Sequence, residues 1–440
     1  MNYPFRIGEF GAGVPAFLPA QARMPAWNVP KSDREALKEL AKRYAELAAQ
    51  PVNQERIARL RDMNDLKPVR PPVWIDELPW HELNVTGELT LHCQSEEAKT
   101  LEEFFRRILF RWKYFQADMV VEDTLWLIKS YSSNGIGISI KEETIATDTE
   151  NAVVSHHYED QLDTDAKVDA LTAPAVKAHP EIDRKNLEVL SEILDGALPV
   201  ALRGHYVDYS PWEHMAEFRG VQQCIDDIIE RPELIHKTMK KFADLGTSFF
   251  DQCEAEGLLD FNIQKNHCTP AYTSGLPAKD YDGGKVRFKD TWLRTRAQMF
   301  VMVSPAMRDE YDLQYIRPFL DRAGYVYYGC CEPLDKCMSY LRQIPNMRKI
   351  GASPWANIPS LAEQIGGDYV LARKPNPASV AVGLNEDALK KEIGETVESC
   401  IKHKCPYEFV LKDISTAGRK LENLINWVTV VASVIDKQYR

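Results

Sequence analysis

The sequence has 440 residues, which is more than an ordinary single domain but suits a (β/α)8 barrel with insertions. Its 54 Lys and Arg against 65 Asp and Glu give a formal net charge of −11, which argues against nucleic acid or an anionic lipid surface as a partner. Hydrophobic residues make up 44% and charged residues 27% of the chain, so a disordered protein is excluded.

The nine cysteines are odd in number and follow no disulfide framework, which is typical of a reducing compartment. The first thirty residues are interrupted by prolines and charges and lack the apolar core of a signal peptide. The longest late apolar stretch, residues 428–435, is far shorter than the ~20 residues that span a bilayer. The sequence therefore predicts a cytoplasmic protein without a membrane segment.

The N-terminal region is predicted to be an irregular, proline-rich arm over residues 1–31, lying on the surface or across a partner subunit in a homodimer. A helix is predicted to begin with a capping box between Ser32 and Glu35, and a second helix covers residues 98–115. Residues 1–68 are expected to form an arm with helices, and residues 69–440 a barrel with an insertion around 98–150. The Asn134-Gly135 pair predicts a β-hairpin within that insertion.

The rest of the chain alternates short apolar runs with helical stretches, which indicates βα units and a parallel sheet. Seven strands are predicted, at residues 73–76, 199–204, 261–265, 325–329, 348–352, 368–373 and 407–412. The eighth is expected either inside residues 119–128 or near 299–303. The predicted fold is an α/β (β/α)8 TIM barrel with an N-terminal helical extension and a β-hairpin insertion.

Catalytic residues of such barrels stand just past the C-terminal ends of the strands. This rule, with residue chemistry, gives three sets of candidates. The predicted catalytic residues are Asp413, Lys374 and His205, the predicted substrate-binding residues are Glu77, Trp80, Arg203, Tyr206 and Trp355, and the predicted metal ligands are His267, Cys330 and Glu332. His403 and Cys405 precede the last strand, so they are expected at the opposite, structural end.

The metal prediction depends on the segment from Tyr328 to Pro333. Strand alternation would place Cys330 and Glu332 on one side and Cys331 on the other. A thiolate, a carboxylate and a histidine from another strand can hold zinc with an open coordination position. The competing interpretation is two buried thiols and a surface glutamate beside a turn.

Three stretches, residues 70–74, 304–318 and 325–332, resemble the uroporphyrinogen decarboxylase-like superfamily, which includes the cobamide-dependent methyltransferases. The resemblance covers roughly residues 70–440 and implies a (β/α)8 barrel. Asp76 and Glu77 stand where the decarboxylase carries arginines for its polyacid substrate, so that activity is disfavoured. In the methyltransferase branch zinc is bound by a His-x-Cys pair and a late Cys; here Tyr328 takes the His position, Cys330 the Cys position, and the late position falls near Asp413.

The resemblance implies a zinc-dependent methyltransferase that moves a methyl group from a small, aromatic methyl ether to cob(I)alamin on a separate corrinoid protein, with zinc polarising the departing oxygen. None of the ten histidines has Asp two residues before it, so the chain lacks the Asp-x-His-x-x-Gly motif of the cobamide carrier itself. The alternatives are a metal-free decarboxylase of a small acid bound by Arg203 and Lys374, transfer from the corrinoid to a thiol or folate, and a noncatalytic binding barrel.

Overall fold

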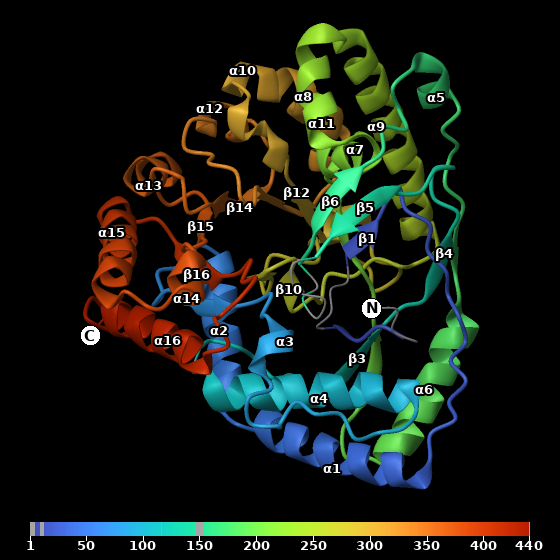
Figure 1. Cartoon of the computed structure of the whole chain (residues 1–440), viewed down its shortest axis with the longest axis vertical. Coiled ribbons are helices and arrows are strands. Elements are labelled where there is room, and N and C mark those ends of the chain that lie inside the picture. Colours follow the sequence, from blue (N-terminus) through green and yellow to red (C-terminus); the bar gives the residue numbers. More distant parts are fainter. Residues whose placement is uncertain (1–4, 9–12, 116, 147–150, 152, 440) are drawn as a thin grey trace.

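The computed structural model describes residues 5–8, 13–115, 117–146, 151 and 153–439. Within this part of the chain eight strands form one sheet, and every neighbouring pair in it is parallel. In sheet order they are β1 (Gly13–Pro15), β9 (Tyr206–Asp208), β12 (Trp292–Thr295), β13 (Tyr325–Tyr328), β14 (Met347–Ala352), β15 (Val370–Arg373), β16 (Tyr407–Leu411) and β2 (Val73–Ile75). The sheet curls around the centre of the molecule, with helices outside it (Figure 1).

The remaining arc of the barrel is built less regularly. β3 (Leu125–Ile128) pairs in parallel with β8 (Val200–Arg203), and β8 leads through Gly204 and His205 directly into β9. On the other side, Asp118 closes the gap to β2: its N–H donates to the Val73 carbonyl, and its carboxylate accepts the Val73 N–H, both at 2.8 Å. The predicted α/β, TIM-barrel-like fold class is confirmed, with part of the ring closed by a loop.

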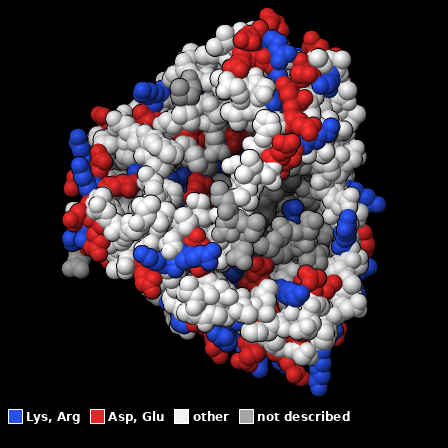
Figure 2. Space-filling model, in the orientation of Figure 1, with Lys and Arg blue, Asp and Glu red and all other residues white. Residues whose placement is uncertain are grey.

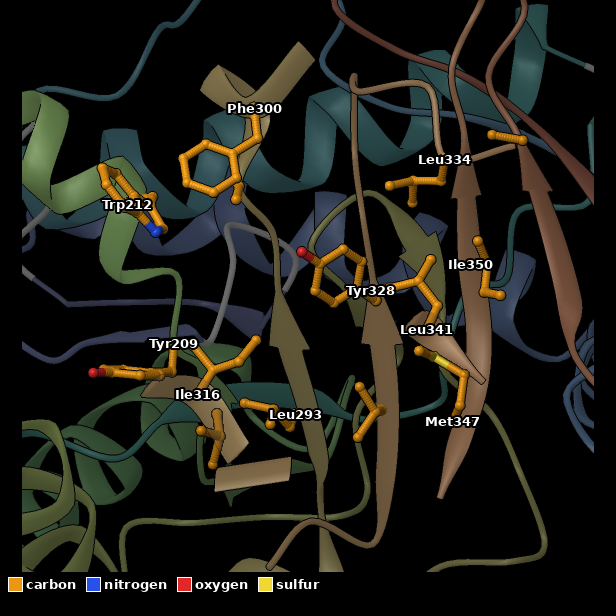
Figure 3. Packing of buried hydrophobic residues seen from close by; sticks show 14 of the residues in the cluster. Tyr209, Trp212, Leu293, Phe300, Ile316, Tyr328, Leu334, Leu341, Met347 and Ile350 are labelled. Atoms are coloured by element: carbon orange, nitrogen blue, oxygen red, sulfur yellow. The ribbon is translucent and has the colours of Figure 1, made fainter. Parts of the chain in front are cut away.

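Side chains of the strands alternate between the helical layer and the barrel interior, as the pleat requires. Leu293, Tyr328 and Ile350 face outward, where they pack with Ile316 and Leu341 of the surrounding helices (Figure 3). Burying each aliphatic side chain contributes about 1.5–3 kcal/mol. The inward positions are more polar, and this places charged groups inside the barrel.

Helices cover the outside of the sheet. Those of the barrel are α7 (Pro211–Arg219), α8 (Val221–Glu230), α9 (Pro232–Ala255), α10 (Pro305–Arg308), α11 (Gln314–Leu320), α12 (Met338–Leu341), α13 (Ile358–Ile365), α14 (Ala378–Ala381), α15 (Glu386–His403) and α16 (Leu421–Asp436). Those of the N-terminal half are α1 (Lys31–Ala48), α2 (Val52–Asn64), α3 (Trp80–Leu83), α4 (Glu96–Tyr114), α5 (Asp165–Asp169) and α6 (Pro180–Leu194). No helix of the described chain is long and apolar enough to span a bilayer.

The N-terminal arm and first helix differ from the sequence prediction. The described arm lies only partly on the surface: β1 joins the sheet beside β9 and Phe17 is fully buried, whereas residues 18–30 are mostly exposed or half-buried. Helix α1 begins at Lys31, one residue before the predicted capping box, and Pro30 precedes it without a side-chain cap. The capping box was wrong because Ser32 already lies in the first turn, where the buried Asp33 instead accepts the N–H groups of residues 94 and 95 at 2.8 and 3.1 Å.

The insertion also turns differently. Asn134 and Gly135 do not close a hairpin, because β4 (Tyr131–Ser133) pairs antiparallel with the distant β7 (Val176–Ala178). Gly135 has φ +66°, and a Cβ there would lie 2.8 Å from the Phe17 carbonyl, so the glycine permits close passage of the arm. A β-hairpin does follow, formed by β5 (Glu142–Ile145) and β6 (Ser155–Tyr158); part of its turn lies outside the described residues.

Six of the seven predicted strands are confirmed, and β3 supplies one inside residues 119–128. Residues 261–265 are not a strand of the barrel. Instead β10 (Lys265–Asn266) and β11 (Thr269–Pro270) form a small antiparallel hairpin at the centre of the ring (Figure 1). The Lys349 ammonium and the Asn64 amide both donate to the Pro270 carbonyl, at 2.9 and 3.1 Å. The hairpin thus occupies the interior of the barrel.

Candidate functional site

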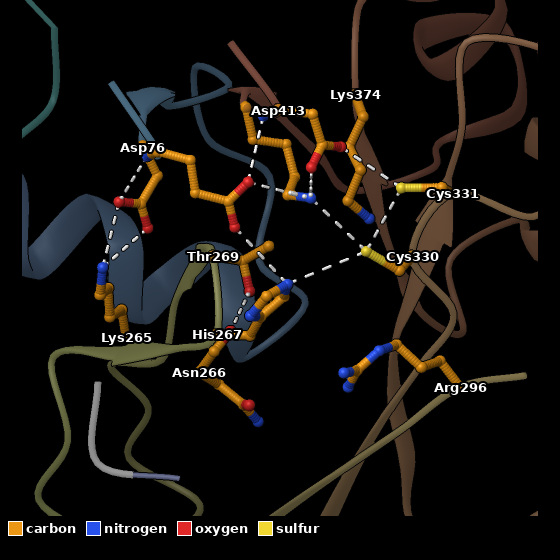
Figure 4. A network of polar contacts seen from close by, with 12 residues as sticks. Asp76, Lys265, Asn266, His267, Thr269, Arg296, Cys330, Cys331, Lys374 and Asp413 are labelled. Carbon is orange, nitrogen blue, oxygen red and sulfur yellow. Dashed lines mark hydrogen bonds and ion pairs between the residues drawn. The ribbon is translucent and has the colours of Figure 1, made fainter. Parts of the chain in front are cut away.

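Polar side chains from several strand ends meet the tip of the central hairpin (Figure 4). Cys330 and Cys331 follow β13, Lys374 follows β15, Lys412 and Asp413 follow β16, and Glu77 follows β2; His267 lies at the hairpin tip. These are the C-terminal ends of parallel strands, the position of active sites in barrels of this kind. The space-filling view is hollowed left of its centre, and both acidic and basic side chains are visible inside (Figure 2).

The backbone is strained at three of these positions. Glu77, His267 and Asp413 are all non-glycine residues with positive φ, at +51°, +56° and +56°. Such conformations cost about 1–3 kcal/mol each and collect at functional sites. That three of them converge on one cluster supports its assignment as the functional site.

Cys330 is directed into the cluster by Gly329, which has φ +93°. The turn ends the strand alternation, so the sulfurs of Cys330 and Cys331 lie 3.6 Å apart, and the Cys331 sulfur lies 3.3 Å from Asp413 Oδ2. The predicted split of the two cysteines onto opposite sides was therefore wrong. The Cys330 sulfur is 3.7 Å from the Lys412 ammonium and 3.9 Å from His267 Nε2.

Glu332 turns away from the cluster, although strand alternation placed it beside Cys330. Its Oε2 accepts the Cys330 N–H at 2.8 Å, its Oε1 accepts the Ala297 N–H at 3.3 Å, and Arg308 stands 4.0 Å away. The structure does not support the ligand role predicted for Glu332. The buried carboxylate instead holds the turn that carries Cys330.

The electrostatic environment favours a thiolate at Cys330. A hydrogen bond from the Cys331 thiol, together with the nearby charges of Lys374 and Arg294, holds the Cys330 pKa well below its usual range, although burial alone would raise it. Burial lowers the pKa of His267 to about 4, so this ring is neutral at physiological pH. The site therefore pairs an anionic sulfur with a neutral imidazole.

Glu77 is the carboxyl group of the cluster whose pKa is raised. Burial and the neighbouring carboxylates of Asp413 and Asp76 raise its pKa to about 7, against the opposing effect of Lys412. Its Oε2 accepts the Asp413 N–H at 3.1 Å and lies 3.3 Å from Lys412, and its Oε1 lies 3.7 Å from His267 Nε2. Asp413 is 2.6 Å from Lys412, which together with Glu77 keeps the Asp413 pKa low.

Two further predicted residues lie beside this cluster. Lys374 is buried and donates to the Tyr327 hydroxyl at 2.9 Å. The Tyr206 hydroxyl accepts the His267 N–H at 3.1 Å, so Tyr206 supports the hairpin tip and is not exposed for stacking on a ligand.

The other predicted residues are held elsewhere. Arg203 forms a bidentate pair with Glu122 at 3.0 and 3.1 Å, and His205 is buried with Nε2 2.9 Å from the Lys129 carbonyl. Trp80 packs against Phe110 beneath the guanidinium of Arg107, and Trp355 is 71% exposed. These contacts engage Arg203, His205 and Trp80 away from Cys330. The pairing of Arg203 with Glu122 leaves the decarboxylase alternative without its carboxylate-binding arginine.

The sequence prediction missed Lys412, Arg294 and Arg296. Arg294 lies in β12 and Arg296 directly follows it, and the two arginines at a spacing of two, flanked by Leu293 and Ala297, were the available signal. Lys412 is adjacent to the predicted Asp413 and is buried among Cys330, Glu77 and Asp413.

The structure does not gather the three predicted zinc ligands, His267, Cys330 and Glu332, around one point. Within the described residues no three His, Cys, Asp or Glu side chains are gathered so that they could hold a metal. Zinc sites require three or four such ligands, but Glu332 is directed elsewhere. The Lys412 ammonium already stands among the thiolate and carboxylates, where a bound cation would be attracted.

A cavity of about 600 Å³ lies away from the cluster and is lined by residues including Trp126, Lys129, Phe261 and Tyr281. None of the cluster residues lines it. We assign the candidate site to the strand ends because the strained backbone and the shifted pKa values occur there.

Comparison with known proteins found no matching family model and no matching curated protein. Among solved structures, the chain is similar to a methyltransferase from Methanosarcina mazei, with a TM-score of 0.47 and 13% sequence identity over 88% of this chain and 99% of that chain. The assignment of residues to the site rests on the geometry of this chain.

Proposed function

We propose that this protein is a methyltransferase that takes a methyl group from a small oxygen-linked donor onto Cys330 and passes it to a reduced cobamide on a separate protein. The observation that carries the proposal is the buried Cys330 thiolate, held beside Lys412 and near a glutamate whose pKa is about 7. A thiolate is the soft nucleophile that attack on a methyl carbon requires. The methyl ether and the cobamide come from the sequence resemblance.

In the first half-reaction the Cys330 sulfur attacks the methyl carbon and the carbon–oxygen bond breaks. The electron pair of that bond goes to the donor oxygen, and Glu77, protonated below about pH 7, gives that oxygen its proton. The products are S-methylated Cys330, the free hydroxyl compound and ionised Glu77. General acid catalysis of this type contributes about 10²- to 10⁴-fold, and neutral His267, 3.7 Å from Glu77, can orient the acid.

In the second half-reaction the cysteine must leave as a thiolate. The same environment that lowers the Cys330 pKa, including the charge of Lys374 and the hydrogen bond from Cys331, makes this sulfur a better leaving group. The reduced cobamide supplies a strong nucleophile for the methyl group. Glu77 regains a proton from solvent before the next cycle.

The test is to incubate the protein with a panel of methoxybenzoic acids and methoxybenzenes in the absence of an acceptor. We expect a mass gain equal to one CH₂ that peptide mapping assigns to Cys330. Cys330→Ser should abolish it. Cys405→Ser is the matched control, because Cys405 is a buried thiol that precedes β16 at the opposite end of the barrel.

Two outcomes contradict the proposal. Turnover with cob(I)alamin in the Cys330→Ser protein would show that the methyl group does not pass through this sulfur. Release of CO₂ from the benzoic acids without formation of a hydroxyl product would favour the decarboxylase alternative.

A further inference from the structure

Several polar atoms beside Cys330 are buried but have no hydrogen-bond partner among the described residues. Arg294 is fully buried; its Nη1 donates to the Thr295 carbonyl at 2.8 Å, whereas its Nε and Nη2 have no acceptor. Asn266 is 2% exposed, and neither its Nδ2 nor its Oδ1 has a partner. Each unsatisfied group costs about 1–3 kcal/mol, so native proteins keep few of them without a reason.

The free donors of Arg294 are arranged for a particular acceptor. Nε and Nη2 lie on the same edge of the guanidinium, and this edge donates two parallel hydrogen bonds to the two oxygens of a carboxylate. The guanidinium is fixed in place by the Nη1 bond and by the ring of Tyr327, whose centroid is 4.5 Å away. The fork is therefore rigid before any ligand binds.

Two cations of the same region also lack a close acidic partner. Neither Arg294 nor Lys374 forms an ion pair within 4.0 Å in the described chain, although both are buried. Other buried cations of this barrel have acidic partners: Lys349 lies 2.8 Å from Glu408, and Arg203 lies 3.0 Å from Glu122. The carboxylates that act on these cations from further away already have closer partners: Asp208 lies 3.2 Å from Arg296, and Glu408 lies 2.8 Å from Lys349.

The groups lie in one region of the barrel interior: Arg294 and Lys374 both contact the Tyr327 ring and both act on Cys330, and Arg294 also acts on His267, the neighbour of Asn266. Arg294 is at an inward-facing position of β12, and Lys374 comes directly after the end of β15. Asn266 lies on the central hairpin next to His267. In Figure 4, Arg296 points from the strand side toward the hairpin that carries Asn266 and His267, and Cys330 lies beside His267. An oxyanion in this region can accept from the Arg294 fork and the Asn266 amide while its other end reaches the thiolate.

We propose that Arg294, Asn266 and Lys374 form a carboxylate-binding subsite that holds the anionic end of the substrate next to Cys330. The inference deepens the proposed function: the methyl donor is a small carboxylic acid, such as a ring-methoxylated aromatic acid, and not a neutral ether. Arg294 selects the donor and orients it for attack.

The test measures binding of benzoate, benzamide and inorganic phosphate to the full chain by isothermal titration calorimetry. We expect benzoate to bind and the neutral, isosteric benzamide to bind much more weakly. Arg294→Lys keeps the charge but loses the fork, and it should weaken benzoate binding by about 10- to 100-fold, the size expected for two charge-assisted hydrogen bonds. Asn266→Ala should give a smaller loss in the same direction. Arg322→Gln is the control, since Arg322 is a surface arginine that pairs with Asp251.

Equal binding of benzoate and benzamide, or unchanged benzoate affinity in a folded Arg294→Lys protein, overturns the subsite. Binding of phosphate with no binding of benzoate overturns the carboxylate assignment. If Arg294→Lys does not fold by circular dichroism, Lys374→Met provides the same test, and unchanged benzoate affinity in that variant overturns the subsite. Arg294-dependent benzoate binding without methylation of Cys330 refutes the proposed function alone, whereas methylation of Cys330 by neutral methoxybenzene as readily as by methoxybenzoate refutes the subsite alone.

Discussion

The barrel interior contains two groups of buried charge that are organised differently. In the middle of the sheet, Lys349 on β14 pairs with Glu408 on β16 at 2.8 Å, and the same ammonium donates to the hairpin carbonyl of Pro270. At the strand ends, Arg294 and Lys374 form no ion pair with a carboxylate, and both charges help to lower the pKa of Cys330. The first group meets the usual requirement that buried charge be paired; the second departs from it.

This difference separates structure from function. A paired interior lysine stabilises the packing of the hairpin against the sheet and needs nothing from outside the chain. An unpaired cation next to a low-pKa sulfur lowers stability and is retained where it contacts a ligand or a reacting group. The strained φ angles of Glu77, His267 and Asp413 also occur at the strand ends, which further supports a functional role for that region.

The largest expected effect concerns Glu77, the proton donor at the strand ends. Glu77→Gln should slow methylation of Cys330 by about 10²- to 10⁴-fold at pH 6, because the amide cannot donate the proton that the leaving oxygen requires. In the wild-type protein the rate should fall as the pH rises through about 7, where Glu77 ionises. The variant should show no such fall, and single-turnover rates between pH 5 and 9 measure both effects.

The stability of the Glu77→Gln protein independently tests whether folding raises the pKa of Glu77. The pKa of Glu77 is raised in the folded state, so its favourable contribution is fully present below the unfolded value near 4.5 and is lost as the pH rises through about 7. Above pH 7 the variant should therefore be more stable than the wild type in urea titrations. A variant that is less stable at pH 8 than the wild type would contradict the raised pKa.

The second prediction compares the two lysines directly. Lys349→Met leaves Glu408 buried without its partner and should reduce the free energy of unfolding by about 3–5 kcal/mol. Lys374→Met removes a buried charge that has no carboxylate partner, so it should cost far less or stabilise the protein. Urea unfolding at pH 7 measures both. Equal losses in the two variants would remove the distinction between the paired and unpaired groups.

Much of the strand arrangement could be predicted from the sequence. Strands β13, β14, β15 and β16 are short apolar runs, and the rule that active-site residues follow strand ends brought Cys330, Lys374, Asp413 and Glu77 together correctly. β12 was not recognised because its inward positions include Arg294, which interrupts the apolar pattern. The rule also placed His267 at the rim for the wrong reason, since a hairpin inside the barrel carries it and not a barrel strand.

The failures within the site have local or long-range causes that a single sequence does not reveal. The direction of Glu332 depends on the positive φ of Gly329, which ends the alternation one residue earlier than expected. The loss of Arg203 as a ligand-binding residue depends on Glu122, 81 residues away. Residue types predicted the chemistry of the site, whereas the partners of those residues had to come from the structure.

The smallest expected effect tests the turn that joins the sheet to the site. Gly329 has φ +93°, and a Cβ there would lie 2.4 Å from Leu334 Cδ1, so Gly329→Ala should lower the free energy of unfolding by more than the ~1 kcal/mol typical of a mildly strained site. Because this turn aims Cys330, the variant should also lose the high reactivity of that thiol toward iodoacetamide at pH 6. Gly394→Ala is the matched control: this glycine lies inside α15 with no atom within 4 Å of the added carbon, so alanine should stabilise the protein by up to about 1 kcal/mol and leave Cys330 unchanged. If Gly329→Ala keeps full thiol reactivity while losing stability, the turn supports the fold but does not set the direction of Cys330. The lowered pKa of Cys330 must then come from Lys374, Arg294 and the Cys331 hydrogen bond, whatever the conformation of that turn.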